Sequence, residues 1–217
     1  MSAERDSRED FAALVMRLRA DGVSNLALLK AVEATPREQF VSKAYADFVW
    51  SDRTIPLECG SFLEGADTMV KLLNLLDLKE GQRVLDIGTG SGFTAAVMAR
   101  ICERVLSIDR YRTLAESARR RLSKMGLTNI VTRQADGSRK LSGEGTFDRI
   151  FVSAAFDSMP RMFTEHLVSE GIMLAPMLRE DGSVVMARFV KIGSRFDRED
   201  LFDIAYLPLA SGLASTL

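Results

Sequence analysis

The chain has few of the residues that build metal sites and catalytic triads. Its 217 residues include two cysteines, Cys59 and Cys102, which are far apart, and one histidine, His166. Two thiols and one imidazole cannot make a typical zinc site, and a lone histidine argues against a Ser-His-Asp triad. We therefore expect no metal ion. The helical pattern around His166 predicts a surface or helix-end position for that side chain.

An excess of one charge sign and long apolar runs are also lacking. Lys and Arg total 29 against 30 for Asp and Glu, whereas proteins that bind nucleic acid usually carry a basic surplus. The polar N-terminus MSAERDSRED has no apolar core of a signal peptide, and Lys71 and Asp77 interrupt the most apolar stretch. We expect a cytoplasmic protein that binds neither nucleic acid nor a membrane. Its oligomeric state does not follow from the sequence.

The first third of the sequence predicts short helices followed by a loop. Apolar periodicity predicts helices over residues 9–20 and 25–34, with Ser24 as the N-cap of the second. The run Thr35-Pro36-Arg37-Glu38 has the order of capping residue, proline and glutamate that starts a helix. Residues 52–65 keep no steady period and predict a loop.

From residue 67 onward the pattern becomes that of an α/β domain. Apolar runs alternate with helical periods, which is typical of a parallel sheet with right-handed crossovers. The predicted strands are 83–87, 104–108, 129–133, 148–153, 171–177, 183–192 and 201–209, and the predicted helices are 67–78, 93–101, 113–125 and 159–167. A turn at residues 180–182 predicts an antiparallel pair. We expect a Rossmann-like domain over 67–217, with helices on both faces of a mostly parallel sheet, and a helical cap with a substrate loop over 1–66.

The strongest motif is the glycine loop between the first predicted parallel strand and its helix, at Gly88, Gly90 and Gly92. A dinucleotide fingerprint would require a small residue where Phe93 stands. Asp86, just before the loop, would repel a pyrophosphate but would suit the ammonium and sulfonium groups of S-adenosylmethionine. The pattern D-x-G-x-G-x-G therefore favours S-adenosylmethionine over a dinucleotide.

Two further acidic residues follow the next two predicted strands. Asp109 ends the second strand, where a carboxylate can accept hydrogen bonds from both hydroxyls of a ribose. Asp136 and Gly137 follow the third strand, where they can flank an adenine ring, although Asp-Gly is also a common turn. Acidic side chains at the ends of three consecutive strands predict one nucleoside site.

These residues lie in segments that resemble the protein-L-isoaspartate (D-aspartate) O-methyltransferases. The resemblance covers roughly residues 35–209. It rests on the segments TPREQFVSKAYAD, RVLDIGTGSGFTAAVMAR, SIDRYRTLAESARRRL, QADGSRKLSGEGTFDRIFVSAAFDSMP and AYLPLASGL. It implies a class I methyltransferase fold and a repair enzyme that methylates the carboxylate of isoaspartyl residues in damaged proteins.

The resemblance also implies which residues contact the cofactor and the substrate. By position, the S-adenosylmethionine contacts would be Asp86, Gly88, Thr89, Gly90, Gly92, Asp109, Asp136 and Gly137. The protein or peptide substrate would lie over Ala154 and Ala155 and near Pro208 and Leu209.

The sequence departs from the family in the loop that precedes residue 69. Family members carry a G-x-T-I-S-like run whose hydroxyls hold the acceptor carboxylate, and here residues 59–67 read CGSFLEGAD. Ser61 is the only hydroxyl left in that run, so it is our candidate for the catalytic role. Glu64 and Asp67 add negative charge that would repel a carboxylate acceptor. Two alternatives therefore stay open: a methyltransferase with another acceptor, and a binding module without turnover.

Overall fold

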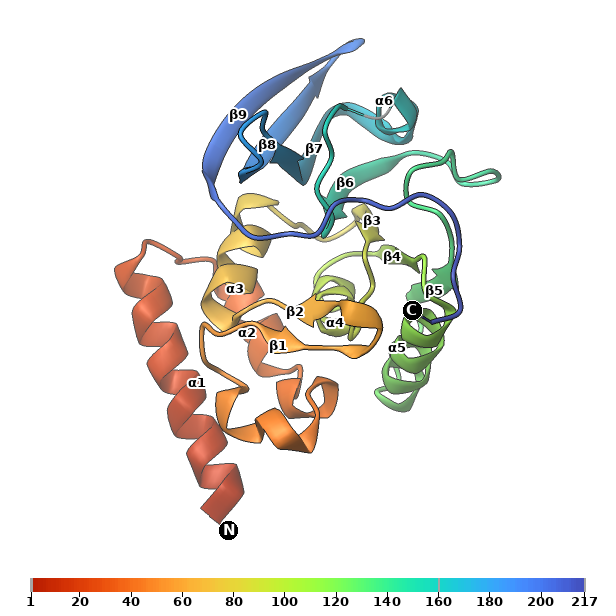
Figure 1. Ribbon diagram of the computed structural model, residues 1–217. Coiled ribbons are helices and arrows are strands. Elements are labelled where there is room, and N and C mark those ends of the chain that lie inside the picture. The colour runs from red at the N-terminus through yellow and green to blue at the C-terminus, as the bar shows by residue number, and fades with distance from the viewer. Residues whose placement is uncertain (1, 160, 217) are drawn as a thin grey trace.

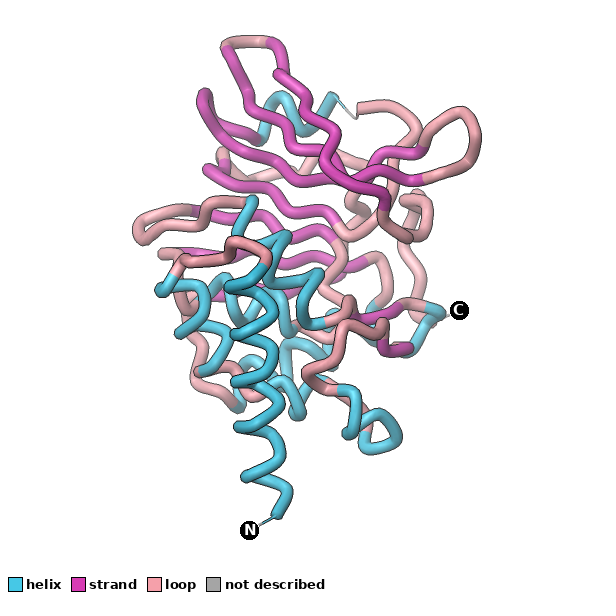
Figure 2. The backbone as a smooth tube through the Cα atoms, turned by 90° about the vertical axis from the view of Figure 1, so that its left-hand side faces the viewer, coloured by secondary structure: helices cyan, strands magenta, loops and turns pink. Residues whose placement is uncertain are grey.

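The chain forms one seven-stranded sheet with helices on both faces (Figures 1 and 2). The computed structural model describes residues 2–159 and 161–216. The strands run in the order β5-β4-β3-β6-β7-β8-β9 across the sheet. Their bounds are β3 Arg83–Ile87, β4 Arg104–Asp109, β5 Ile130–Gln134, β6 Phe147–Val152, β7 Leu167–Leu178, β8 Val184–Ile192 and β9 Arg195–Asp203.

The strand directions place a crevice at one edge of the sheet. Strands β3 to β7 are parallel, and β8 and β9 add antiparallel pairs at one side. The chain moves outward from β3 through β4 to β5 and then returns to the other side of β3 with β6. Open α/β sheets bind ligands outside the carboxyl ends of the strands at such a reversal. The fold class predicted from the sequence, a Rossmann-like methyltransferase fold, is confirmed.

Helices cover the sheet unequally on its two faces. The helices are α1 Ser2–Ala20, α2 Leu26–Glu33, α3 Ala66–Leu75, α4 Phe93–Ala99, α5 Arg112–Lys124 and α6 Arg161–His166, with 3-10 turns at Arg37–Phe40, Lys43–Phe48 and Glu58–Gly60. Buried side chains of α3, α4 and α5 pack with Val84 and Val105 on one face. Met162 and Phe163 of α6 pack with Leu85 on the other face. Pro160, part of the predicted helix 159–167, lies outside the described residues.

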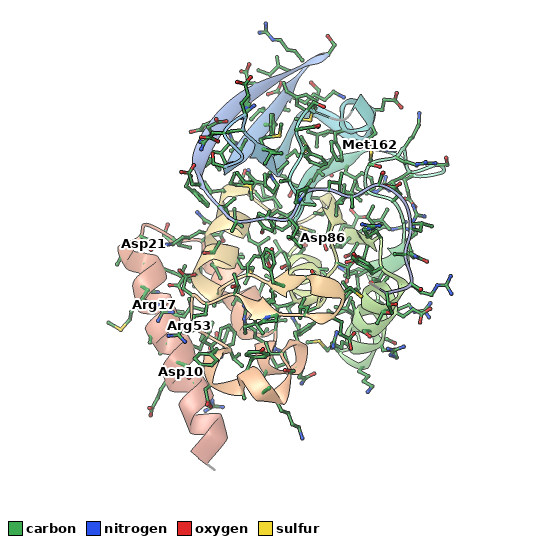
Figure 3. The ribbon with its side chains drawn as sticks, viewed as in Figure 1. Asp10, Arg17, Asp21, Arg53, Asp86 and Met162 are labelled. Carbon is green, nitrogen blue, oxygen red and sulfur yellow. The ribbon has the colours of Figure 1, made fainter. Side chains whose placement is uncertain are left out.

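The N-terminal helices join the core of the first face. Leu14 of α1 and Leu28 of α2 belong to the same buried cluster as Met69 of α3. Arg17 lies on α1 (Figure 3). Its guanidinium donates to both carboxylate oxygens of Asp67 on α3, at 2.8 and 2.7 Å. The start of α1 extends away from the rest of the molecule (Figures 1 and 2).

Local predictions failed where side-chain patterns were ambiguous. The N-cap of α2 is Asn25, whose side chain accepts from the Leu28 amide, so the prediction of Ser24 is wrong by one residue. The loop predicted over 52–65 contains a short hairpin of β1 Ile55–Pro56 and β2 Phe62–Leu63. The strand predicted over 201–209 is also wrong in its bounds, because the ladder with β8 ends at Asp203.

Beyond β9 the chain forms an extended segment, residues 204–216, which we name the strap. It crosses the carboxyl ends of the strands toward α5 (Figure 1). The Ala155 amide donates to the Leu207 carbonyl at 2.8 Å, and the Leu209 amide donates to the Ala155 carbonyl at 2.8 Å. Near the end of the strap, the Arg112 amide donates to the Ala214 carbonyl at 3.0 Å. These bonds hold the strap over the crevice.

Some side chains named in the sequence have structural positions. His166 is buried at the end of α6, where its Nε2 accepts from the Leu141 amide at 3.2 Å, so it ties a loop to the second face. Cys59 is half-buried and Cys102 is buried. Within 2–159 and 161–216, no helix is long and apolar enough to cross a membrane, and no group of three or more His, Cys, Asp or Glu side chains could hold a metal ion.

Candidate active site

Two neighbouring cavities open at the carboxyl ends of the parallel strands. The larger one, which we name the outer cavity, has a volume of about 330 Å³ and lies in the range of small-molecule sites. The hairpin and the strap form part of its wall. Its lining residues are Cys59, Ser61, Ile87, Gly88, Ile108, Asp109, Arg110, Tyr111, Leu114, Ala135, Gly137, Ser153, Ala154, Leu207, Pro208, Leu209 and Ala210.

The smaller one, the inner cavity, measures about 50 Å³ and lies between the hairpin and the glycine loop. Its lining residues are Ser61, Phe62, Leu63, Glu64, Gly88, Thr89, Gly90, Ser91, Thr94, Ser153, Tyr206 and Leu207. Ser61, Gly88, Ser153 and Leu207 line both cavities, which makes the two contiguous. A ligand with a bulky ring system and a narrow polar tail matches this shape.

The glycine loop needs its glycines for two different reasons. Gly88, Gly90 and Gly92 all have positive φ, at 103°, 51° and 89°, a region that residues with a Cβ rarely adopt. A Cβ on Gly88 would lie 2.9 Å from the Ser153 Cβ, and one on Gly92 would lie 2.9 Å from the Ala118 Cβ. A Cβ on Gly90 would meet nothing closer than 3.4 Å. Gly88 and Gly92 therefore allow close packing, whereas Gly90 is required for its positive φ alone.

Asp109 joins the outer cavity to the glycine loop. It is buried at the end of β4, where Oδ2 accepts from the Gly90 amide at 3.0 Å and Oδ1 accepts from the Tyr111 amide at 2.9 Å. Burial raises the pKa of this carboxyl, while the two amides oppose the shift. A carboxylate has about four acceptor positions, so two remain for the hydroxyls of a bound ribose.

Asp136 lies outside both cavities, whereas Gly137 lines the outer one. The Asp136 carboxylate accepts from the Ser138 amide at 2.9 Å, from the Ser138 hydroxyl at 2.6 Å and from the Gly212 amide at 2.7 Å. It therefore anchors the strap. A Cβ on Gly137 would lie 2.5 Å from Cγ2 of Ile87, so any larger residue here would force the buried Ile87 side chain to move.

Asp86, on β3 just before the glycine loop, lies near the centre of the molecule (Figure 3). It is buried and lines neither cavity. Its Oδ2 accepts from the Ser107 hydroxyl at 2.6 Å, and Ser107 also lies 2.7 Å from the hydroxyl of Thr89. Its Oδ1 has no hydrogen-bond partner within the described part of the chain. Burial raises the pKa of Asp86 to about 7. Thr89 itself lines the inner cavity.

The two acidic residues of the divergent loop have different environments. Asp67 faces α1 and is neutralised by Arg17. Glu64 lines the inner cavity, where its Oε1 accepts from the Tyr206 hydroxyl at 2.5 Å. Of these two residues, only Glu64 therefore places a negative charge at the site.

Three of the four predicted substrate residues line the outer cavity, namely Ala154, Pro208 and Leu209. Ala155 does not line it but pairs with Pro208 of the strap. Sequence reasoning did not identify Ser153 or Tyr206 as site residues. Ser153 could have been found from its place at the end of β6, whereas the role of Tyr206 depends on a contact with Glu64, far away in the sequence.

Comparison with known proteins decides the family. The model of the protein-L-isoaspartate (D-aspartate) O-methyltransferase family (PCMT) matches residues 9–214. The chain belongs to this family. A protein-L-isoaspartate O-methyltransferase of Rhizobium meliloti (strain 1021) is 58% identical over 204 residues, which cover 94% of this chain and 100% of the relative. One of Maricaulis maris (strain MCS10) is 39% identical over 94% of this chain and 95% of its own length.

Solved structures agree with this family assignment. A structure named protein-L-isoaspartate O-methyltransferase has a TM-score of 0.84 and 25% identity, over 94% of this chain and 67% of that one. A Plasmodium falciparum structure in complex with S-adenosyl-L-homocysteine has a TM-score of 0.77 and covers 91% of this chain and 97% of that one. At 19% identity it supports the fold alone. The family predicted from the sequence is confirmed.

The cavities of this PCMT-family chain fit its cofactor, S-adenosylmethionine. The outer cavity offers apolar side chains for a purine ring and Asp109 for a ribose. Arg110 is the only Lys or Arg side chain among the described residues that line either cavity, and Asp109 and Glu64 are acidic. A pyrophosphate would be repelled here, whereas a ligand with an ammonium and a sulfonium group is favoured. The chain is an S-adenosylmethionine-dependent methyltransferase.

Proposed function

We propose that the chain transfers the methyl group of S-adenosylmethionine to the α-carboxylate of isoaspartyl residues in damaged proteins. The observation that carries this proposal is the pair of contiguous cavities at the strand ends, with Ser61 at their junction, in a chain of the PCMT family. The methyl ester formed would then collapse to a succinimide without further catalysis, which begins the repair of the damaged residue.

The reaction needs alignment more than proton transfer. A carboxylate acceptor is already ionised near neutral pH, so no general base is required. None of the described lining residues is a histidine, which suits such a reaction. When bound, S-adenosylmethionine supplies a methyl group made electrophilic by the adjoining sulfonium. The protein has to hold the acceptor oxygen about 3 Å from that carbon, in line with the sulfur.

We infer that the hairpin and the strap, which form part of the cavity wall, provide this alignment. We assign the Ser61 hydroxyl to hydrogen-bond the acceptor carboxylate, because Ser61 is partly exposed and lines both cavities. Ala154, Pro208 and Leu209 would contact the peptide chain. These apolar walls exclude water, and a dry site favours a transition state in which opposite charges cancel.

A methyl-transfer assay with an isoaspartyl peptide and its aspartyl twin tests the proposal. We expect transfer to the isoaspartyl peptide only. Ser61→Ala should lower its rate while S-adenosylmethionine affinity stays nearly constant, because the hydroxyl would orient the acceptor alone. Ser123→Ala, an exposed serine on α5, is the matched control and should change neither quantity. Binding of the cofactor without transfer to either peptide would instead favour another acceptor or a binding module.

We further propose that residues 1–66 act as a helical cap with the substrate loop and that residues 67–217 form the cofactor-binding domain. The placement of Ser61 at the junction of the two cavities supports a substrate role for the loop. We also propose a cytoplasmic location, because a sequence with only two cysteines, far apart along the chain, suits a reducing compartment.

A further inference from the structure

The inner cavity has one strongly charged wall. Glu64 is 7% exposed and is the only Asp, Glu, Lys or Arg among the described residues that line this cavity. The glycine loop forms the opposite wall, so the carboxylate faces the part of the site where a narrow polar tail would lie. A volume of about 50 Å³ admits a small end group rather than a peptide chain.

The protein holds this carboxylate in place without neutralising it. The Tyr206 hydroxyl donates to Oε1 at 2.5 Å, and the Phe62 ring packs 5.6 Å from the Tyr206 ring. Burial, together with the charge of Glu64, raises the pKa of Tyr206 well above its ordinary value, so the phenol keeps the proton that it donates. One neutral hydrogen bond does not offset the cost of burying a carboxylate.

Arg37, a buried cation, contacts the backbone of Glu64 but makes no ion pair with its carboxylate in the described residues. Arg37 donates to the backbone carbonyls of Glu64 and Val49, and its guanidinium lies 4.7 Å from the centre of the Phe93 ring. Burial lowers the pKa of Arg37 to about 10, so it stays charged at neutral pH and gives Glu64 long-range support. Within the residues that the structure describes, no ion pair joins the Glu64 carboxylate to a cation. A cationic ligand group would complete the arrangement.

Asp86, the residue that the sequence assigned to the cofactor's amino group, is poorly placed for that role. It is 1% exposed, lines neither cavity and already accepts from Ser107. With a pKa of about 7, it also carries less than a full charge at neutral pH. Glu64 instead presents a carboxylate at the cavity surface.

We propose that Glu64, and not Asp86, accepts the hydrogen bonds of the amino group on the methionine end of S-adenosylmethionine, with Tyr206 as the residue that positions its carboxylate. The inference rests on the cofactor-binding part of the proposed function and is independent of the methyl acceptor. An ammonium group has three donors, and its hydrogen bond to a carboxylate is charge-assisted and strong.

Calorimetry with three ligands tests the assignment. S-adenosylmethionine has the amino group and a positively charged sulfonium, and S-adenosylhomocysteine has the amino group and a neutral sulfur. 5′-Methylthioadenosine has a neutral sulfur and no amino acid end. Glu64→Gln should weaken binding of the first two by about 10- to 100-fold and of the third by less than about threefold. Glu58→Gln, an exposed glutamate of the same hairpin that lines neither cavity, should leave all three affinities unchanged.

Other patterns of loss overturn the proposal. If only S-adenosylmethionine binds more weakly, Glu64 interacts with the sulfonium. If all three ligands bind more weakly to the same extent, Glu64 has a structural role. If no affinity changes, Glu64 is not part of the site. Glu64→Ser provides a smaller side chain if the glutamine variant does not fold, with the same selective loss expected. The calorimetry uses no methyl acceptor, so its result does not depend on whether the protein methylates isoaspartyl peptides. A failure of the Glu64 assignment can therefore be distinguished from a failure of the proposed function.

Discussion

Replacing Asp86 by asparagine should remove one component of the pH dependence of unfolding. Asp86 is buried, with a hydrogen bond from Ser107 to Oδ2 and no partner for Oδ1 within the described chain. Desolvation, opposed by the Ser107 hydroxyl, raises its pKa from the ordinary 3.8 to about 7 in the folded protein. The folded state therefore retains a proton that the unfolded state releases.

The sign and size of the effect follow from these two pKa values. A proton held more tightly by the folded state stabilises it fully below pH 3.8, and this stabilisation is lost as the pH rises through about 7. Between pH 5 and pH 8 the free energy of unfolding should fall by about 2–3 kcal/mol on account of Asp86. Asparagine does not titrate, so Asp86→Asn should lack this component.

Urea unfolding of both proteins at pH 5 and pH 8, without cofactor, measures the difference. We expect the change in unfolding free energy between the two pH values to be about 2–3 kcal/mol larger in wild type than in the variant. Asp181→Asn, in an exposed turn where a serine hydroxyl lowers the carboxyl pKa, is a control that should keep the wild-type dependence in this range. Equal pH dependence in wild type and Asp86→Asn would refute a protonated Asp86 in the folded state.

Two further substitutions test the cavity wall and the loop. Asp109→Ala should weaken S-adenosylmethionine binding by about 1.5–3 kcal/mol in calorimetry, because the change removes a charged acceptor and leaves the Gly90 amide without its hydrogen bond. Unchanged affinity in a folded variant would show that Asp109 is not part of the site. Gly92→Ala should lower the urea midpoint, since its Cβ would lie 2.9 Å from that of Ala118 at a φ of 89°. Gly126→Ala, at a φ of 70° with open space around it, should cost less, and equal losses would argue against crowding at Gly92.

The parallel part of the sheet could be predicted because its strands carry short apolar runs, which are buried on both faces in β3, β4 and β6. Their continuous apolar runs fixed β3 at residues 83–87 and the bounds of β4 to β6 within one residue. Strand β9 was not predicted in full, since Arg195–Asp203 is mostly exposed and is defined by main-chain pairing with β8 alone. The apolar residues after Asp203 suggested a strand, but Tyr206 and Leu209 belong to the strap and line the cavities.

The site could be predicted where the backbone decides the position of a residue. Asp109 and the glycine loop lie at strand ends, and strand ends in a parallel sheet meet at one edge. Asp86 was harder to place, because side chains alternate along a strand. It shares a face with Val84, which packs in the core cluster of α3 and α4, so it points beneath the loop and away from the crevice. No local pattern indicates this.

The contact between Glu64 and Tyr206 changes how the divergent loop should be understood. From the sequence alone, Glu64 appears only as a charge that repels a carboxylate acceptor. In the folded chain it faces a small cavity beside the glycine loop, and the only other acidic residue of that loop, Asp67, is neutralised by Arg17. If the amino group of the cofactor pairs with Glu64, the repulsion falls once the cofactor is bound. Charge compensation then favours entry of the cofactor before the acceptor, and a carboxylate in this loop becomes compatible with a carboxylate substrate.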